Sequence, residues 1–229
     1  MKLRTYMTII AVFSITILFA QNDCSAFYPF EEGATAEITT YDKRGDIAAK
    51  VTYMVSEISQ NGGNTTAEMN MDMRDTDGTL ITQSTYDVLC NNEGIEIDFK
   101  SMFSPQMATQ FNDMETEITG TNIVLPNDLT VGQTLPDADM QARINMSGIN
   151  MNMSVKMQDR KVVGQESVST PAGTFDCYVI SYSNDIKMGI NQRGSAKQWI
   201  AKGVGLVKQE DYNRRGKVTS SSLLTAFSN

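Results

Sequence analysis

Apolar and polar residues alternate with a period of two along much of this chain, which is the pattern of half-buried β-strands. The alternation is clearest in residues 161–182, where two runs rich in β-branched residues flank Thr170-Pro171-Ala172-Gly173. Proline fixes φ for a turn and glycine accepts the positive φ that the return needs, so this stretch predicts a β-hairpin. After the turn, one face carries Phe175, Cys177, Val179 and Ser181, and the other carries Asp176, Tyr178, Ile180 and Tyr182.

Three further turns share one sequence form, an Asp or Asn followed three residues later by Gly. They lie at residues 42–45, 75–78 and 213–216. An Asx side chain caps a turn and glycine supplies its left-handed residue, so each predicts a hairpin. The paired strands are 34–41 with 47–58, 65–74 with 79–89, and 205–212 with 217–226, and residues 140–157 form one long strand or a bent pair broken near Gly148.

Residues 104–119 depart from this alternation. Their apolar positions recur at the spacing of one helical face, with Ser104 suited to the N-cap, Pro105 to the first turn and Gly120 to the stop. We therefore expect an all-β fold over residues 21–229, in a single domain. It is a curved antiparallel sheet, with this one amphipathic helix on its concave face.

Methionine is the compositional anomaly, with 15 residues, and it falls on alternate strand positions. One predicted inner face holds Met69, Met71 and Met73, and a second holds Met151, Met153 and Met157 among aliphatic residues. Three interpretations are open. The faces are ordinary core, because methionine fills irregular gaps; or they form a pliable cavity for an apolar ligand; or their thioethers bind Cu(I). Alternation alone favours the core.

Residues 1–20 have the form of a secretory signal peptide. Lys2 and Arg4 precede an apolar run from Met7 to Ala20, and the run is too short to span a bilayer. Because residues 21–23 lack the small apolar residues of a lipobox, plain export is favoured over lipid attachment at Cys24. We expect an exported protein, periplasmic or extracellular, with no transmembrane segment.

The three cysteines are Cys24, Cys90 and Cys177. An exported protein oxidises pairs of cysteines, so one disulfide with one thiol left over is expected, and the spacing leaves the pairing open. No pair is spaced as CxxC and the chain contains no histidine, so we expect no zinc or other metal site.

Charge and missing motifs exclude several functions. The net charge of -8 disfavours nucleic acid as a partner, since an acidic surface repels phosphate. Without histidine there is no Ser-His or Cys-His pair to activate a nucleophile. No phosphate-binding loop or dinucleotide fingerprint occurs either, so we expect no enzyme and no cofactor.

Several segments resemble a known family. They are Cys24-Ser25-Ala26-Phe27-Tyr28-Pro29-Phe30, Thr170-Pro171-Ala172-Gly173-Thr174-Phe175-Asp176-Cys177-Tyr178 and Gly203-Val204-Gly205-Leu206-Val207-Lys208, together with Cys90. They are similar to the TapB-like group of exported DUF proteins, of unknown function, from Bacteroidetes-type bacteria. The resemblance implies an envelope protein with a partly open antiparallel barrel, similar in shape to periplasmic lipoprotein carriers. It supplies no catalytic residues.

Together these observations predict a non-catalytic envelope protein that binds a lipid or acyl chain in a Met-rich concave interior. The predicted ligand-lining residues are Met69, Met71, Met73, Met107, Phe111, Met151 and Met153. The alternative is a structural or assembly protein of the envelope, with a solid core and a protein partner.

Overall fold

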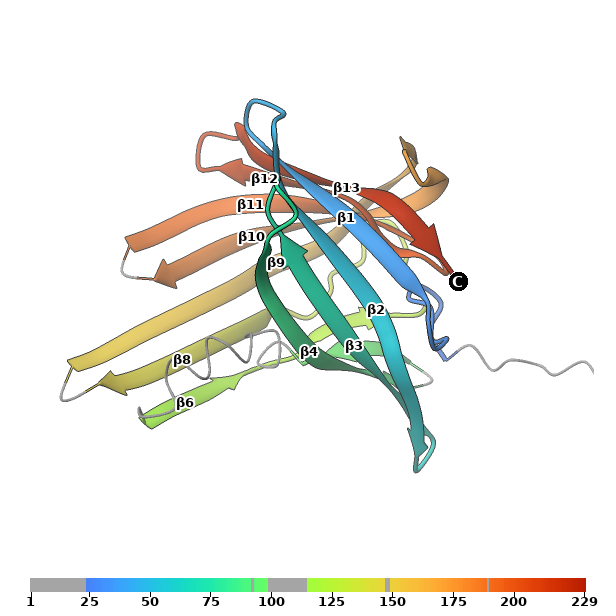
Figure 1. The fold of residues 1–229 in the computed structure, drawn as a ribbon, viewed down its shortest axis with the longest axis horizontal. Helices are drawn as coiled ribbons and strands as arrows, with labels where there is room; N and C mark the ends of the chain where they lie inside the picture. Colours follow the sequence, from blue (N-terminus) through green and yellow to red (C-terminus); the bar gives the residue numbers. More distant parts are fainter. Residues whose placement is uncertain (1–23, 92, 99–114, 147–148, 189) are drawn as a thin grey trace, which may run out of the picture.

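The computed structural model describes residues 24–91, 93–98, 115–146, 149–188 and 190–229. These residues form a single antiparallel sheet, which confirms the all-β prediction (Figure 1). Its thirteen strands are β1 (Thr35–Asp42), β2 (Ile47–Asn61), β3 (Asn64–Arg74), β4 (Leu80–Asn91), β5 (Gly94–Ile97), β6 (Glu115–Gly120), β7 (Ile123–Pro126), β8 (Ala138–Met146), β9 (Ile149–Thr170), β10 (Gly173–Met188), β11 (Ile190–Ala201), β12 (Gly205–Asn213) and β13 (Val218–Ser228).

The sheet consists of two limbs, each running mostly from one strand to its neighbour in sequence. Its order is β6-β8-β9-β10-β11-β12-β13-β1-β2-β3-β4-β5-β7. The first and last strands, β1 and β13, therefore pair at the middle and join the limbs. Phe27, Val88 and Ile180 belong to one apolar cluster, so the core receives side chains from both limbs.

The two edge strands of this sheet are consecutive in sequence. Only Thr121 and Asn122 separate the end of β6 from the start of β7. Thr121 donates its backbone N–H to the carbonyl of Asp139 in β8, and the amide of Asn122 donates to Glu96 in β5. Two residues span less than about 10 Å, so the sheet must curl until its edges meet there. It curves strongly without closing, since β6 and β7 do not pair.

The three Asx-x-x-Gly turns form as predicted and share one hydrogen-bond pattern. In the first, Asp42 Oδ1 accepts the backbone N–H groups of Arg44 and Asp46, and Gly45 has φ +87°. The Asp75 and Asn213 turns repeat these contacts. All three predicted hairpins are therefore confirmed.

The hairpin of β9 and β10 is also confirmed, with Thr170 paired to Gly173 across its turn. Consecutive residues of this sheet enter different apolar clusters. Val179 and Trp199 pack in one cluster, whereas the next residues along, Ile180 and Ile200, pack in the other. Adjacent strand residues point to opposite faces, so β10 and β11 bury side chains on both faces.

The predicted amphipathic helix is wrong for those of its residues that the structure describes. Most of residues 104–119 lie outside the described residues, but Glu115–Gly120 is strand β6, so the helix does not reach residue 119. No helix occurs among the described residues. Backbone pairing with β8 decides the conformation of residues 115–120, and the spacing of Met114 and Ile118 carries no information about that pairing.

Candidate functional site

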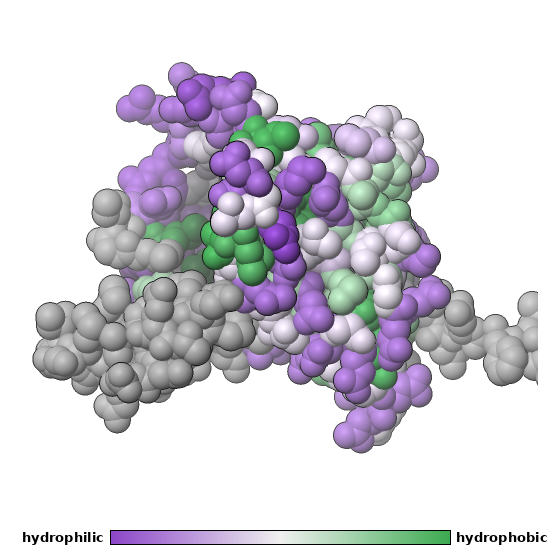
Figure 2. All heavy atoms as spheres, in the orientation of Figure 1, coloured by the Kyte–Doolittle hydropathy of each residue, from purple (hydrophilic) through white to green (hydrophobic). Residues whose placement is uncertain are grey.

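A mostly apolar cavity lies between the two limbs, with a volume of about 240 Å³. Aliphatic side chains from both limbs line most of it, such as Ile38 and Val55 from one and Ile180 and Leu206 from the other. The outer face in Figure 2 is mostly hydrophilic, with hydrophobic residues in small separate patches. The apolar lining thus contrasts with the face of the molecule shown in Figure 2.

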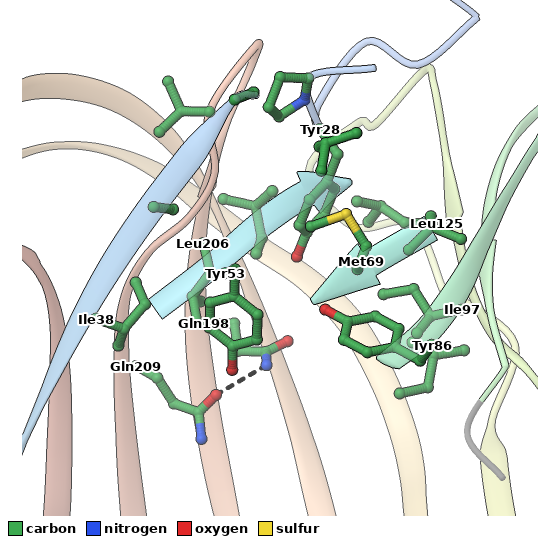
Figure 3. Close-up of a pocket in the computed structure, with 18 of the residues that line it drawn as sticks. Tyr28, Ile38, Tyr53, Met69, Tyr86, Ile97, Leu125, Gln198, Leu206 and Gln209 are labelled. Carbon is green, nitrogen blue, oxygen red and sulfur yellow. Dashed lines mark hydrogen bonds between the residues drawn. The ribbon is translucent and has the colours of Figure 1, made fainter. Parts of the chain in front are cut away.

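Tyrosines provide the polar groups of one wall of this cavity. Tyr53 and Tyr86 come from β2 and β4, and Tyr28 comes from the segment before β1 (Figure 3). Met69 lies opposite Tyr86 in the register of β3 and β4 and is drawn between Tyr28 and Tyr86. Figure 3 marks no hydrogen bond between the three hydroxyls and the other side chains that it draws.

A pair of amides faces these tyrosines from the other limb. Gln198 Nε2 donates to Gln209 Oε1 at 2.9 Å, joining β11 to β12 at the cavity (Figure 3). Both residues are partly buried, and Gln209 Nε2 donates to the carboxylate of Asp211. The Gln198 side-chain oxygen remains as an acceptor for a bound molecule. The site therefore combines an apolar interior with a small number of polar groups, as ligand sites do.

A disulfide fixes the N-terminal segment, residues 24–33, that carries Tyr28. Cys24 is bonded to Cys90 of β4, and Cys177 is a buried free thiol. This resolves the pairing that the sequence left open. The amide of Asn127 holds the same segment from both sides, accepting from the backbone of Ala26 at 2.7 Å and donating to the carbonyl of Cys24 at 2.8 Å.

Two more contacts seat this segment. Phe27 is 1% exposed and packs edge-on against Tyr178, with ring centroids 5.8 Å apart. Tyr28 passes directly over Gly205, where an added Cβ would lie 2.7 Å from the tyrosine ring. Glycine at 205 therefore makes room for this wall of the cavity.

Arg160 of β9 also lines the cavity, and it is 2% exposed. Its Nη1 donates to the carbonyl oxygens of Val124 at 3.0 Å and Pro136 at 2.7 Å. Burial lowers the pKa of Arg160, whereas the charges of Tyr182, Asp137 and Tyr28 raise it. A guanidinium stays charged near neutral pH, so the cavity wall contains a buried cation.

Burial sets the protonation of the tyrosines. It raises the pKa of Tyr28 to about 12, with Tyr53 adding to the rise and Arg160 opposing it. Burial likewise raises the pKa of Tyr53, and burial together with the charges of Tyr53 and Tyr28 raises that of Tyr86. All three hydroxyls are protonated at neutral pH, which makes them hydrogen-bond donors and poor bases.

The structure brings one of the predicted lining methionines to the cavity. Met69 lines it, whereas Met71 packs against the adjoining core and Met73 lies further along β3. Met153 is buried beside a second, more polar hollow among β6, β8, β9 and β10. Met107 and Phe111 lie outside the described residues, as does the side chain of Met151.

The residues that sequence reasoning missed are the tyrosines, the glutamines and Arg160. Tyr53 and Tyr86 lie at alternate positions with buried residues, so the sequence pattern could have predicted that they point inward. That they meet at one cavity depends on the order of the strands, which the pattern does not give. Arg160 had a weaker signal. Met157 and Val162 are both buried, and an odd spacing between two inward residues requires an irregularity between them.

Other chemistry is sparse in the part of the chain that the structure describes. No group of three or more acidic or cysteine side chains there is placed to hold a metal ion. Burial raises the pKa of the Cys177 thiol to about 11, so this thiol is not a nucleophile at neutral pH. Within the same residues, no helix has the length and hydropathy needed to cross a membrane.

Comparisons with known proteins give a family and a fold. A family model described as DUF3108-like matches residues 31–224, and no curated protein matches the chain. A crystal structure of a candidate exported protein with a YmcC-like fold, from Bacteroides fragilis, has a TM-score of 0.73 at 21% identity. A candidate lipoprotein from Parabacteroides distasonis has a TM-score of 0.73 at 23% identity. Each comparison covers 90% of this chain and 100% of the other, and at this identity it shows a shared fold.

Proposed function

The chain belongs to the DUF3108-like family, and from that premise we propose that it is an exported, non-catalytic envelope protein that binds the apolar part of a small molecule. The observation that carries the proposal is the enclosed apolar cavity between the limbs. In this proposal the interior that binds is lined mainly by tyrosine and aliphatic side chains, with Met69 and Met157 as its methionines.

Three observations support export. Residues 1–20 have the charge and apolar pattern of a signal peptide. The disulfide between Cys24 and Cys90 fits an oxidising compartment. The two solved structures of the same fold are described as a candidate exported protein and a candidate lipoprotein. Because its sulfur is in the disulfide, Cys24 has no thiol to carry a lipid in this state.

The size and lining of the cavity support binding. An apolar cavity of about 150 Å³ stays dry and takes up benzene. The cavity here, at about 240 Å³, has room for a longer group. Each Å² of apolar surface that leaves water contributes about 25 cal/mol, so a short alkyl chain gains several kcal/mol before entropic costs.

The chemistry of the lining supports a role without catalysis. At neutral pH its tyrosines are protonated, and no histidine is present to act with them. The groups that remain can orient a ligand by hydrogen bonds without abstracting a proton.

A second candidate is an assembly protein that docks on a partner through the turn end of the sheet. Exposed aliphatic residues follow the three Asx-x-x-Gly turns, with Ile47 45%, Leu80 42% and Val218 45% exposed. The starts of β2, β4 and β13 lie at one end of the sheet, since these strands run in the same direction. A partner that protects these residues, with an empty cavity, would favour this role.

The test uses a cavity-filling variant with a matched control. Ala36 of β1 lines the cavity opposite Tyr53 and Phe227, whereas Ala226 on the neighbouring strand is exposed. We expect the fluorescence of N-phenyl-1-naphthylamine to rise on binding the wild-type protein. Ala36→Phe should weaken that binding at least about tenfold, and Ala226→Phe should leave it unchanged.

The binding proposal fails if the wild-type protein leaves the probe's fluorescence unchanged, or if Ala36→Phe binds it equally well while keeping native circular dichroism. Native mass spectrometry of protein taken from its own envelope then identifies a resident molecule by mass.

A further inference from the structure

Arg160 points inward because β9 contains a bulge just before it. Lys161 pairs with Ser181 and Gln158 pairs with Ser183, so two residues of β9 stand opposite the single residue between them in β10. One of the two, Asp159, has φ +56°, a left-handed conformation that Asp adopts more readily than most other non-glycine residues. Without this extra residue the alternation from Met157 would turn Arg160 outward.

The buried guanidinium has unsatisfied hydrogen-bonding capacity. Its Nε is buried and has no hydrogen-bond partner, although Nη1 has two carbonyl acceptors. The titratable groups that act on it are Tyr182, Asp137 and Tyr28, and of these only the exposed Asp137 is a carboxylate. In the described residues no ion pair neutralises Arg160.

A buried charge without a counter-charge is costly, and such groups are normally paired. Here the bulge places a buried cation at an apolar cavity that Tyr28 also lines, which calls for a counter-charge within that cavity.

We propose that the ligand is an alkyl or acyl chain with an anionic oxygen, carboxylate or phosphate, which accepts a hydrogen bond from the guanidinium of Arg160. The proposal rests on the binding function proposed above. The alkyl part lies along the aliphatic and tyrosine walls, and the Tyr28 hydroxyl donates a second hydrogen bond to the same oxygen. The net charge of -8 repels anions at long range, but salt screens this repulsion beyond about 8 Å. The nearby charge of Arg160 therefore determines whether an anion is attracted to the cavity.

Calorimetric titration of the wild-type protein at physiological salt tests this with three ligands of one chain length: octanoate, octyl phosphate and octanol. A charged hydrogen bond in a buried site is worth at least about tenfold in affinity, so an anionic ligand should bind at least tenfold more tightly than octanol. The tighter of the two anions identifies the source, a free fatty acid for carboxylate or a phospholipid headgroup for phosphate.

Arg160→Met should remove the preference for the anion while octanol affinity stays within about twofold. Arg215→Met, an exposed turn arginine, is the control and should preserve the preference. Since Arg160 also holds two backbone carbonyls, its variant can lose the fold, and Tyr28→Phe then gives a second test: a severalfold loss for the anion alone.

Equal affinities of octanol and the anions for the wild-type protein would overturn this proposal and leave the binding function intact. Binding of none of the three ligands would overturn both.

Discussion

The buried tyrosines link the chemistry of the cavity to the stability of the fold. Tyr28, Tyr53 and Tyr86 all have pKa values raised by burial, so the folded protein holds their protons more tightly than the unfolded chain does. The contribution of these tyrosines to the free energy of unfolding is therefore fully present below pH 10, the usual tyrosine pKa. It decreases as the pH rises toward 12.

We expect Tyr86→Phe to reduce this alkaline loss of stability. One raised tyrosine steepens the fall by up to about 1.4 kcal/mol per pH unit, because the unfolded chain releases a proton that the native state retains. Urea unfolding between pH 9 and pH 12 measures the slope for both proteins. Tyr41→Phe, at a partly buried site outside the cavity, is the control, and equal slopes for wild type and Tyr86→Phe would contradict the assignment.

At this scale the sequence predicted which side chains turn inward better than it predicted what they enclose. Period-two alternation identified Met69 as inward-facing, and Met69 does line the cavity. It gave Met73 the same status, although Met73 lies away from the cavity, because alternation defines a face and not a position along it. Arg160 depends on one inserted residue, which resets the alternation without leaving a composition signal.

Among the elements, the N-terminal segment works as a fitted wall. It has no strand structure, yet the disulfide, the Asn127 amide and the Ser25 hydroxyl, which accepts from the backbone of Phe27 and Tyr28, hold it in place. The loop closed by the disulfide spans 66 residues, a length for which cross-linking contributes about 4 kcal/mol in the chain-entropy account. The cavity thus depends on a segment outside the sheet.

Gly205→Ala should displace this wall. Gly205 has φ +87° and lies under Tyr28, whereas Gly216 has φ +70° with nothing within 4 Å of an added Cβ. Gly216→Ala should cost about 1–2 kcal/mol from the left-handed backbone alone, and Gly205→Ala should cost clearly more in urea unfolding.

A double-mutant cycle isolates the contact. In a Tyr28→Ala background the cost of Gly205→Ala should fall to that of Gly216→Ala. If the two glycine variants already cost the same in the wild-type background, Tyr28 does not constrain position 205.

Local signals explain which elements were predictable. The Asx-x-x-Gly turns and the hairpin at residues 170–173 are short, and their chemistry is complete within a few residues, so the sequence predicted them correctly. The segment that becomes β6 was misjudged because its conformation comes from β8, about twenty residues later. Helical spacing and non-local pairing competed at residues 115–119, and the pairing prevailed.

For the whole molecule, the link between β6 and β7 sets the curvature. Thr121 is hydrogen-bonded to one edge of the sheet and Asn122 to the other. The limbs are thereby held at the separation that encloses the cavity.

Inserting Gly-Ser-Gly-Ser-Gly-Ser between Thr121 and Asn122 should let the edges separate and weaken N-phenyl-1-naphthylamine binding. The same insertion between Gly62 and Gly63, in the turn of β2 and β3, is the control. Each lengthens a two-residue connection equally and costs about 1 kcal/mol in loop entropy. Equal probe affinities for the two insertions would show that the link does not maintain the cavity.

The overall shape was only partly accessible from sequence. Alternation and hairpin turns predicted a curved antiparallel sheet, and the family resemblance implied that it closes only partly. The structure confirms both. Nothing local predicts that β1 pairs with β13, because that pairing depends on the curl of both limbs.

This pairing has a consequence for biogenesis. Thr39 and Thr225 share a hydrogen bond across 186 positions at the centre of the sheet. A ribosome or a translocation channel delivers the chain from its amino end, so β1 can pair with β2 at once but must wait for nearly all of the polypeptide before β13 arrives. Each limb can form its hairpins between neighbouring strands as the chain emerges. The pairing of β1 with β13 forms last and slowly, as contacts between distant residues do. Until then the middle of the molecule presents two unpaired edges, and a holding chaperone would have to cover them.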